Sequence, residues 1–146
     1  MPDWFLDPSD DSNHLYSTAT ATSRKTQMAI QKATTQARAE LARKFEAKIA
    51  NLTKSFEEEL GVDDASELLQ QFTTATKIVT NQTLSGSEID KKEIQADKGI
   101  YRAYVLMKIP IGKANRKLLD KLLENEENEI RFRGMEFFKE LEAAAD

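Results

Sequence analysis

The residues of this chain whose types suit catalysis or metal binding are few and scattered. His14 is the only histidine and the sequence has no cysteine, which excludes a Cys–His nucleophile pair and a zinc site built from several such ligands. Asp7, Asp10 and Asp11 form an acidic cluster, but it lacks the ligand spacing and turn glycine of a calcium loop. We therefore predict no metal site and interpret the cluster as solvated loop charge.

Other signals of chemistry are equally weak. The glycines are too widely spaced for a phosphate-binding loop. The carboxylates of residues 57–59 lie in a helical pattern, and neighbouring carboxylates on a helix do not indicate catalysis unless they line a pocket. Arg131 and Arg133 flank Phe132, but the acidic run 124–129 precedes them. The net charge of −4 gives no general attraction to phosphate backbones. We predict no enzymatic activity, no cofactor and no nucleic-acid partner.

The first two segments are a lead-in and a strand. Residues 1–13 are rich in Pro, Asp and Ser, which predicts an extended lead-in. Its Trp4 and Phe5 either anchor the segment to the domain or form an exposed aromatic hook for a partner or membrane surface. Strict alternation over residues 14–23 predicts a strand. One face carries only Leu, Ser and Ala, so a helix can pack closely against it.

A long helical pattern follows, from residue 24 to about residue 60, without Pro or Gly. At a rise of 1.5 Å per residue it spans roughly 55 Å, whereas a domain of this size is about 40 Å across. The helix must therefore bend, break or project. Four apolar residues of its second half would then need cover from outside their own chain: Phe45, Ile49, Leu52 and Phe56.

The middle of the chain predicts a helix and a hairpin. Residues from 64 to about 81 continue at helical spacing after Gly61, and they either lie against the domain or swap between subunits. Residues 84–110 read as a hairpin with a turn at 97–99. Its first arm, 85–96, is polar and charged, as in a protected edge strand. Its second arm is apolar on both faces, which predicts the central strand.

Residues 112–146 are expected to form two helical pieces, because Gly134 and the acidic run weaken the middle of the segment. The second piece carries Phe132, Phe137 and Phe138, which must dock either on the sheet of their own chain or on a neighbouring subunit. The fold class is therefore α+β, a small antiparallel sheet in the order strand, long helix, helix, strand, strand, with helices on one face. We expect a lead-in (1–13), a core domain (14–111) and C-terminal helices (112–146).

Several of these segments resemble the bacterial outer-membrane lipoprotein family named after a twenty-kilodalton lipoprotein, the LPP-twenty family, which includes flagellum-associated lipoproteins. The likeness rests on the PDWF lead-in, the strand LYSTATATS, the helix QMAIQKATTQARAELARKFEAKI and the strand YRAYVLMKIPI. It covers roughly residues 2–110. It implies a strand–helix–strand–strand core, an envelope location and, in the flagellar members, assembly into rings. The sequence lacks the lipid-attachment cysteine of the family and has Ser17 and Ala19 where glycine is often found.

Two functions are expected from these observations. The first is a non-catalytic structural protein of the cell envelope, on the periplasmic side of the outer membrane, that forms homo-oligomers or binds envelope proteins. Membrane attachment would then need a lipid anchor that this sequence does not contain. The alternative is a monomeric periplasmic module that binds a peptide, glycan or small ligand. The candidate interaction residues are aromatic or apolar: Trp4, Phe5, Phe45, Ile49, Leu52, Phe56, Phe132, Phe137 and Phe138.

Overall fold

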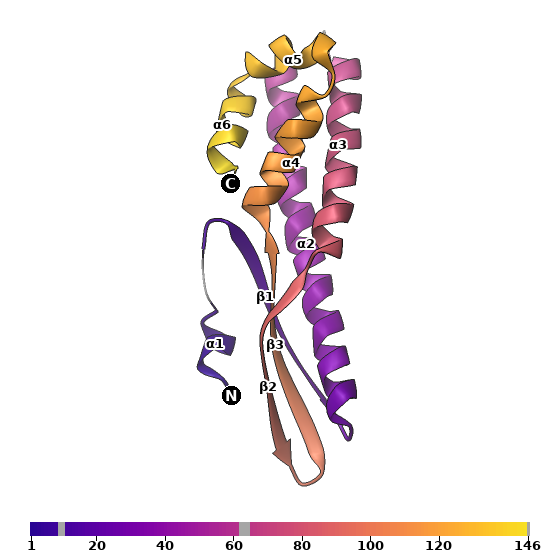
Figure 1. Cartoon of the computed structure of the whole chain (residues 1–146), viewed down its shortest axis with the longest axis vertical. Coiled ribbons are helices and arrows are strands. Elements are labelled where there is room, and N and C mark those ends of the chain that lie inside the picture. The colour runs from indigo at the N-terminus through magenta and orange to yellow at the C-terminus, as the bar shows by residue number, and fades with distance from the viewer. Residues whose placement is uncertain (9–10, 62–64, 146) are drawn as a thin grey trace. The chain divides into compact units, whose positions relative to one another are not determined.

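The structure, a computed structural model, describes residues 1–8, 11–61 and 65–145 (Figure 1). The fold class is α+β, as predicted. Two compact units make up the chain, unit 1 with residues 1–44 and 84–110 and unit 2 with residues 45–83 and 111–146. The elements in chain order are α1 (Asp3–Leu6), β1 (His14–Ser23), α2 (Thr26–Leu60), α3 (Ala65–Ser85), β2 (Glu88–Asp97), β3 (Ile100–Pro110), α4 (Ile111–Leu123), α5 (Glu126–Arg133) and α6 (Glu136–Ala144).

Unit 1 is built on an antiparallel sheet in the order β1-β3-β2. The strand β3 is central, as its apolar character on both faces predicts, and its residues 103–107 are all buried. It pairs with β1 in an unbroken register that includes Ala19 opposite Val105. Lys98 and Gly99 form the two-residue turn between β2 and β3, and both have positive φ, 51° and 81°, as in the type I′ turns that match the twist of a hairpin.

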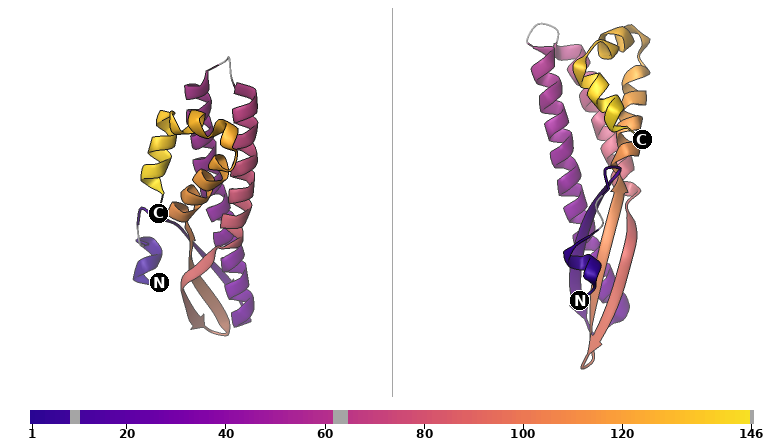
Figure 2. Two further views of the ribbon diagram at one scale, coloured as in Figure 1. Left: turned by 45° about the horizontal axis from the view of Figure 1, so that its top comes forward. Right: turned by 90° about the vertical axis from the view of Figure 1, so that its left-hand side faces the viewer.

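Small residues bring the first half of α2 close to the sheet. Ala29, Ala33 and Ala37 are fully buried along one stripe of the helix. On β1, Ser17, Ala19 and Ala21 are buried on the face that was expected to accept a helix. Views from two directions show α1 and this half of α2 on opposite sides of the sheet (Figures 1 and 2).

Two boundaries in unit 1 differ from the sequence-based expectation. The lead-in contains one helical turn, α1, because the Phe5 ring packs edge-on against Tyr104 with centroids 5.1 Å apart. This contact places Phe5 on the domain, which is one of the two alternatives that the sequence left open for the lead-in. The helix α3 continues to Ser85 rather than ending near Asn81, and β2 begins only at Glu88. Burial of Val79 and Thr83 at helical spacing outweighs the strand propensity of this Thr-rich segment.

An aromatic cluster forms the centre of unit 2. Phe56 stacks on Phe72 with centroids 4.4 Å apart and planes 10° apart, and Phe137 meets both rings edge-on at 5.4 and 5.5 Å. Phe132 lies 6.1 Å from Phe56. The expectation that the second half of α2 needs cover from another chain is therefore wrong for Phe56, because helices α3, α5 and α6 of the same chain cover it.

The C-terminal segment forms three helices where two were expected, because the chain breaks at Gly134 and Met135 as well as at 124–125. Phe137 of α6 packs on Phe56 and Phe72 within unit 2, and Phe138 is buried as well. Met135 offers no side-chain acceptor at the start of α6. The carboxylate of Glu59 on α2 replaces it, accepting the Phe137 N–H at 3.0 Å.

Candidate interaction surface at the β1 edge

The strand β1 forms one edge of the sheet in unit 1, and β2 forms the other. The two edges differ in chemistry. Six of the ten residues of β2 are charged, and a register shift between Ile89 and Lys91 breaks its ladder. Between Leu15 and Ser23, β1 has no charged residue, no Pro and no Gly, and its register with β3 is continuous. The strand β2 therefore has the features that protect an edge strand from pairing with another chain, and the β1 sequence lacks them. We call β1 the open edge.

The hydrogen-bonding pattern shows which groups of β1 point away from the sheet. The Thr20 hydroxyl donates to the main-chain carbonyl of Ala103, 2.9 Å away, so this carbonyl points toward β1. Ala21, opposite Ala103, therefore belongs to a pair that exchanges main-chain hydrogen bonds with β3. Residues of an antiparallel edge strand alternate in this respect. The N–H and C=O groups of residues 16, 18, 20 and 22 thus face outward, and Lys44 Nζ indeed donates to the Tyr16 carbonyl at 2.9 Å.

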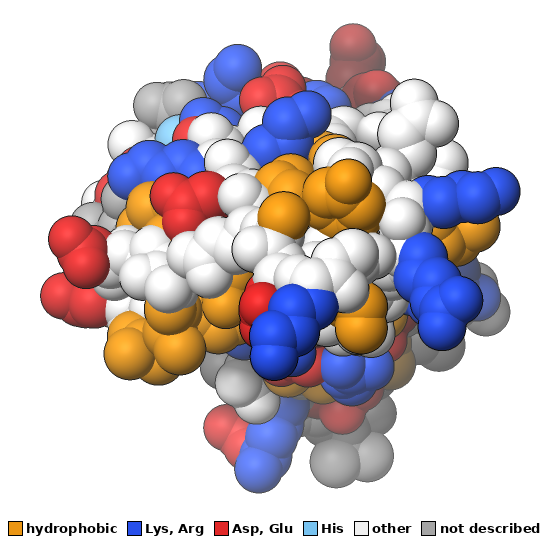
Figure 3. Space-filling model, turned by 90° about the horizontal axis from the view of Figure 1, so that it is seen from below, with side chains coloured by type: hydrophobic (Ala, Val, Ile, Leu, Met, Phe, Trp, Pro, Cys, Tyr) orange, Lys and Arg blue, Asp and Glu red, His pale blue; other side chains and the backbone are white. Residues whose placement is uncertain are grey.

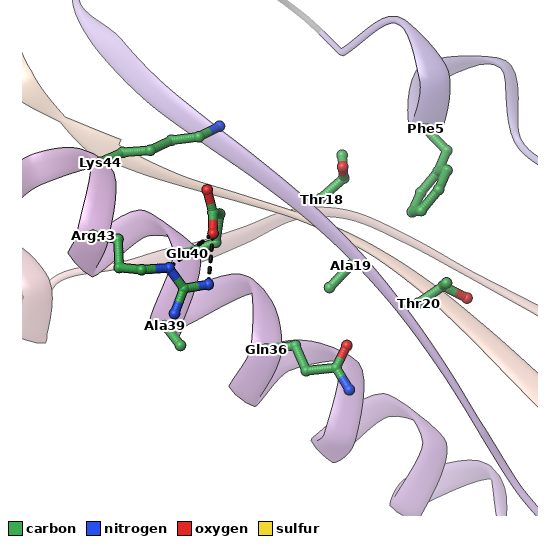
Figure 4. A pocket seen from close by; sticks show the side chains of 9 residues that line it. All are labelled: Phe5, Thr18, Ala19, Thr20, Gln36, Ala39, Glu40, Arg43 and Lys44. Atoms are coloured by element: carbon green, nitrogen blue, oxygen red, sulfur yellow. Dashed lines mark hydrogen bonds and ion pairs between the residues drawn. The ribbon is translucent and has the colours of Figure 1, made fainter.

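A shallow groove of about 700 Å³ follows this edge (Figure 4). Thr18, Ala19 and Thr20 run through it. Phe5 stands on one side of β1 and residues of α2 stand on the other. The lining residues from α2 are Gln36, Ala39, Glu40, Arg43 and Lys44. Main-chain groups that can pair with a further strand therefore lie between one aromatic wall and one polar wall.

The polar wall holds charges of both signs. Arg43 donates to Glu40 Oε2 from Nη2 at 2.6 Å and from Nε at 3.0 Å. The hydrogen bond from Arg43, with its positive charge, lowers the pKa of the Glu40 carboxyl. Both side chains are solvent-accessible, so the pair contributes little to stability.

A second polar cluster lies at the N-terminal end of β1. His14 Nδ1 is 2.9 Å from Asp11 Oδ2, and the Tyr16 hydroxyl donates to the same oxygen at 3.4 Å. Hydrogen bonds from the Asn13 N–H and from His14 lower the pKa of Asp11. Burial raises the pKa of the Tyr16 hydroxyl, and the negative charge of Asp11 adds to this effect.

On the same face, the pKa of the Lys108 ammonium is raised by its hydrogen bond and ion pair with Asp90, 3.2 Å away. This ion pair links β3 to the irregular part of β2. Asp10, expected to share the acidic cluster, lies outside the described residues. Among residues 1–8, 11–61 and 65–145, no group of three His, Asp or Glu side chains is placed to hold a metal ion.

The structure separates the nine candidate interaction residues. Trp4 and Phe5 lie half-buried in unit 1, and Phe5 lines the β1 groove. The remaining seven lie in unit 2: Phe45, Phe56, Phe132, Phe137 and Phe138 are buried, and Ile49 and Leu52 are half-buried. The α2 side of the groove was not identified from the sequence. The sequence contained one signal for the groove, the absence of charged residues from the β1 strand. This signal is informative only when β1 is known to be an edge strand.

Several other large apolar side chains are exposed in the described part of the chain. In unit 1 the large ones include Leu6, Met28, Ile89 and Ile100. The face shown in Figure 3 has hydrophobic side chains in separate patches between Lys, Arg, Asp and Glu. Separate exposed apolar residues are normal on a folded domain. Among the described helices, none is both long and apolar enough to cross a bilayer.

Comparisons of the chain with protein-family models, with curated proteins and with solved structures find no match. The resemblance to the LPP-twenty family stays a prediction that rests on the quoted sequence segments.

Proposed function

We propose that this protein is a non-catalytic structural component that works by association with other polypeptide chains, a second copy of itself first among them. The observation that carries the proposal is the open β1 edge, where outward main-chain groups meet no charged or proline residue within the strand. An edge of this kind is a template for pairing with another strand. The sequence resemblance adds the cell envelope, on the periplasmic side of the outer membrane, as the proposed location.

The support for association is different from the one that the sequence suggested. The aromatic residues of α2 and of the C-terminal helices bury one another in unit 2, so they no longer argue for a partner. The edge strand supplies an independent argument in unit 1. The edge strand offers main-chain hydrogen bonds, so its partner must be an extended polypeptide segment. An apolar stripe on a helix would require only that the partner be hydrophobic.

The alternative function is a monomeric binding module for a peptide, glycan or small ligand. The groove beside β1 favours this candidate, because it combines the Phe5 ring with the hydrogen-bonding groups of Gln36, Glu40 and Arg43. A bound ligand stabilises the folded state by mass action. A monomer whose melting temperature rises with a peptide or glycan would therefore favour the alternative over self-association.

The first test is the solution mass, measured by light scattering after size exclusion over a tenfold concentration range. Self-association predicts a discrete multiple of 16.5 kDa that becomes populated as concentration rises. A monomer at every concentration contradicts self-association. Fractionation of cells that express the natural protein tests the location separately, because a protein found only in the cytoplasmic fraction contradicts the envelope proposal.

A further inference from the structure

We propose that β1 pairs antiparallel with β1 of a second copy, about a two-fold axis at Ala19, to form a continuous six-stranded sheet. This inference rests on the proposed function and names both the partner and the contact. Closed two-fold association is the commonest form of homo-oligomer, and it requires a surface that is complementary to itself. The β1 edge has that property, and the β2 edge does not.

The edge β2 is a poor partner for either strand. Its charged residues are Glu88, Asp90, Lys91, Lys92, Glu93 and Asp97, and burying them against another strand would cost desolvation. The register shift at Ile89 and Lys91 also interrupts the row of main-chain groups that a partner would need. A head-to-tail arrangement of β1 on β2, which would build rings or filaments, is therefore disfavoured relative to β1 on β1.

The outward groups of β1 set the register of the pair. Residues 18 and 20 point their N–H and C=O groups away from β3, and they are the centre of the groove. Placing Thr18 opposite the second copy's Thr20 lets these groups exchange hydrogen bonds in both directions. Tyr16 then lies opposite Thr22, and Lys44 Nζ, which donates to the Tyr16 carbonyl in the single chain, must release it for this pair to form. Cross-strand Thr–Thr contacts on the Phe5 side of the sheet add to the pairing.

The helices leave room for this arrangement. Ser17, Ala19 and Ala21 of β1 are buried on one face, as are Ala103, Val105 and Met107 opposite them on β3, whereas Ile89 of β2 is 40% exposed. The helix α2 therefore lies over β1 and β3. With strands about 4.8 Å apart, two α2 helices related by the axis would lie roughly 10 Å apart. This separation is at the upper end of the range for packed helices.

The side chains on the outer flank of α2 suit such a contact. Ala39 is exposed and small, so it permits close approach of the second helix. Glu40 and Arg43 of one copy carry opposite charges and can pair with Arg43 and Glu40 of the other, while Lys44 on the same flank adds one positive charge per copy. The interface thus joins an uncharged strand with a helix flank that carries charges of both signs.

Substitutions at Thr18 test the contact without disturbing β3. Thr18→Pro removes an N–H that points away from the sheet, so the β1–β3 ladder keeps its hydrogen bonds while edge pairing is blocked. Thr18→Lys adds a charge of the kind that guards natural edges. Gln95→Lys on β2 is the matched control, since it adds the same charge to the other edge. Circular dichroism and a melting curve show whether each variant remains folded.

We expect the wild type and Gln95→Lys to reach twice 16.5 kDa in light scattering, and both Thr18 variants to self-associate at least about tenfold more weakly. Folded Thr18 variants that keep the wild-type mass overturn the β1 contact but leave self-association, and so the proposed function, intact. A wild type that is monomeric throughout overturns both and leaves the groove to a different polypeptide or ligand.

A distance measurement tests the register. The chain contains no cysteine, so Thr22→Cys carries a single spin label without further substitutions. With the axis at Ala19, the two labelled positions are offset by six residues, which places them roughly 20 Å apart. If the two-fold axis lies at Thr18 or Thr20 instead, the offset between the labelled positions changes by two residues. The distance then changes by about 7 Å. A distance far from 20 Å in the dimer overturns the register.

Discussion

Replacing Phe56 with alanine is the sharpest test of how the second half of α2 is covered. The ring is fully buried, stacks on Phe72 and meets Phe137 edge-on. These contacts join α2 to α3 and α6 within unit 2. If they exist in solution, truncation of the ring must weaken folding even in a monomer.

The size of the effect follows from the burial and the ring contacts. A fully buried Phe side chain removes at least about 150 Å² from water, worth roughly 4 kcal/mol at 25 cal/mol per Å². Each aromatic pair adds about 1 kcal/mol, and partial collapse of the cavity recovers some of the loss. Measured Phe→Ala changes in cores cost about 3–5 kcal/mol. We expect Phe56→Ala to lower the free energy of unfolding by about 4 kcal/mol, a large part of the usual total.

Urea denaturation followed by far-ultraviolet circular dichroism measures this change. The fluorescence of Trp4, the only tryptophan, reports on unit 1 in the same samples. Because α2 contributes to both units, we expect the two signals to change together. Ile130→Ala is the matched control, since Ile130 belongs to the same unit but is 84% exposed. It should change stability by no more than about 0.5 kcal/mol.

A cost of less than about 1 kcal/mol for Phe56→Ala, together with a fall in the solution mass, would refute burial of the ring within its own chain. That combination would place the ring in a contact between chains, as the sequence first suggested. A charged residue at position 56 cannot make this distinction. It would bury an unpaired charge in unit 2 and unfold the protein whether or not the chain assembles.

Three further predictions concern single side chains. Ser17→Ala should stabilise the fold by about 1 kcal/mol in chemical denaturation, because the buried Ser17 hydroxyl finds no partner among the described residues; a loss of stability would show that the hydroxyl is satisfied. Glu59→Ala should cost about 1 kcal/mol by removing the acceptor for the Phe137 N–H, whereas Glu58→Ala, on the exposed surface beside it, should be neutral. Tyr16 should ionise above the usual pH of about 10, so the stability that its neutral form contributes is complete below that pH and is lost as pH rises through the raised pKa. Ultraviolet titration should show this late component, and Tyr16→Phe should remove it.

Much of the fold depends on neighbours along the chain, and the sequence by itself determined those parts. Alternation over β1 and the unbroken apolar spacing of α2 are local patterns, and both elements form as predicted. Lys98 and Gly99 likewise specify the hairpin turn through their own backbone conformations. The apolar character of β3 on both faces placed it at the centre of the sheet, because a strand covered on both sides needs apolar residues on both.

Only the tertiary structure decided what covers each apolar face. Phe56 and Phe72 are 16 positions apart and Phe137 lies far beyond them, so no local pattern shows that they form one cluster. The same holds for the groove, where Phe5, β1 and Glu40 meet only because the chain folds. The sequence marks β1 as uncharged but does not say that it lies at an edge. Strand order arises from contacts between distant segments, and these contacts depend on the packing of the whole unit rather than on any one segment.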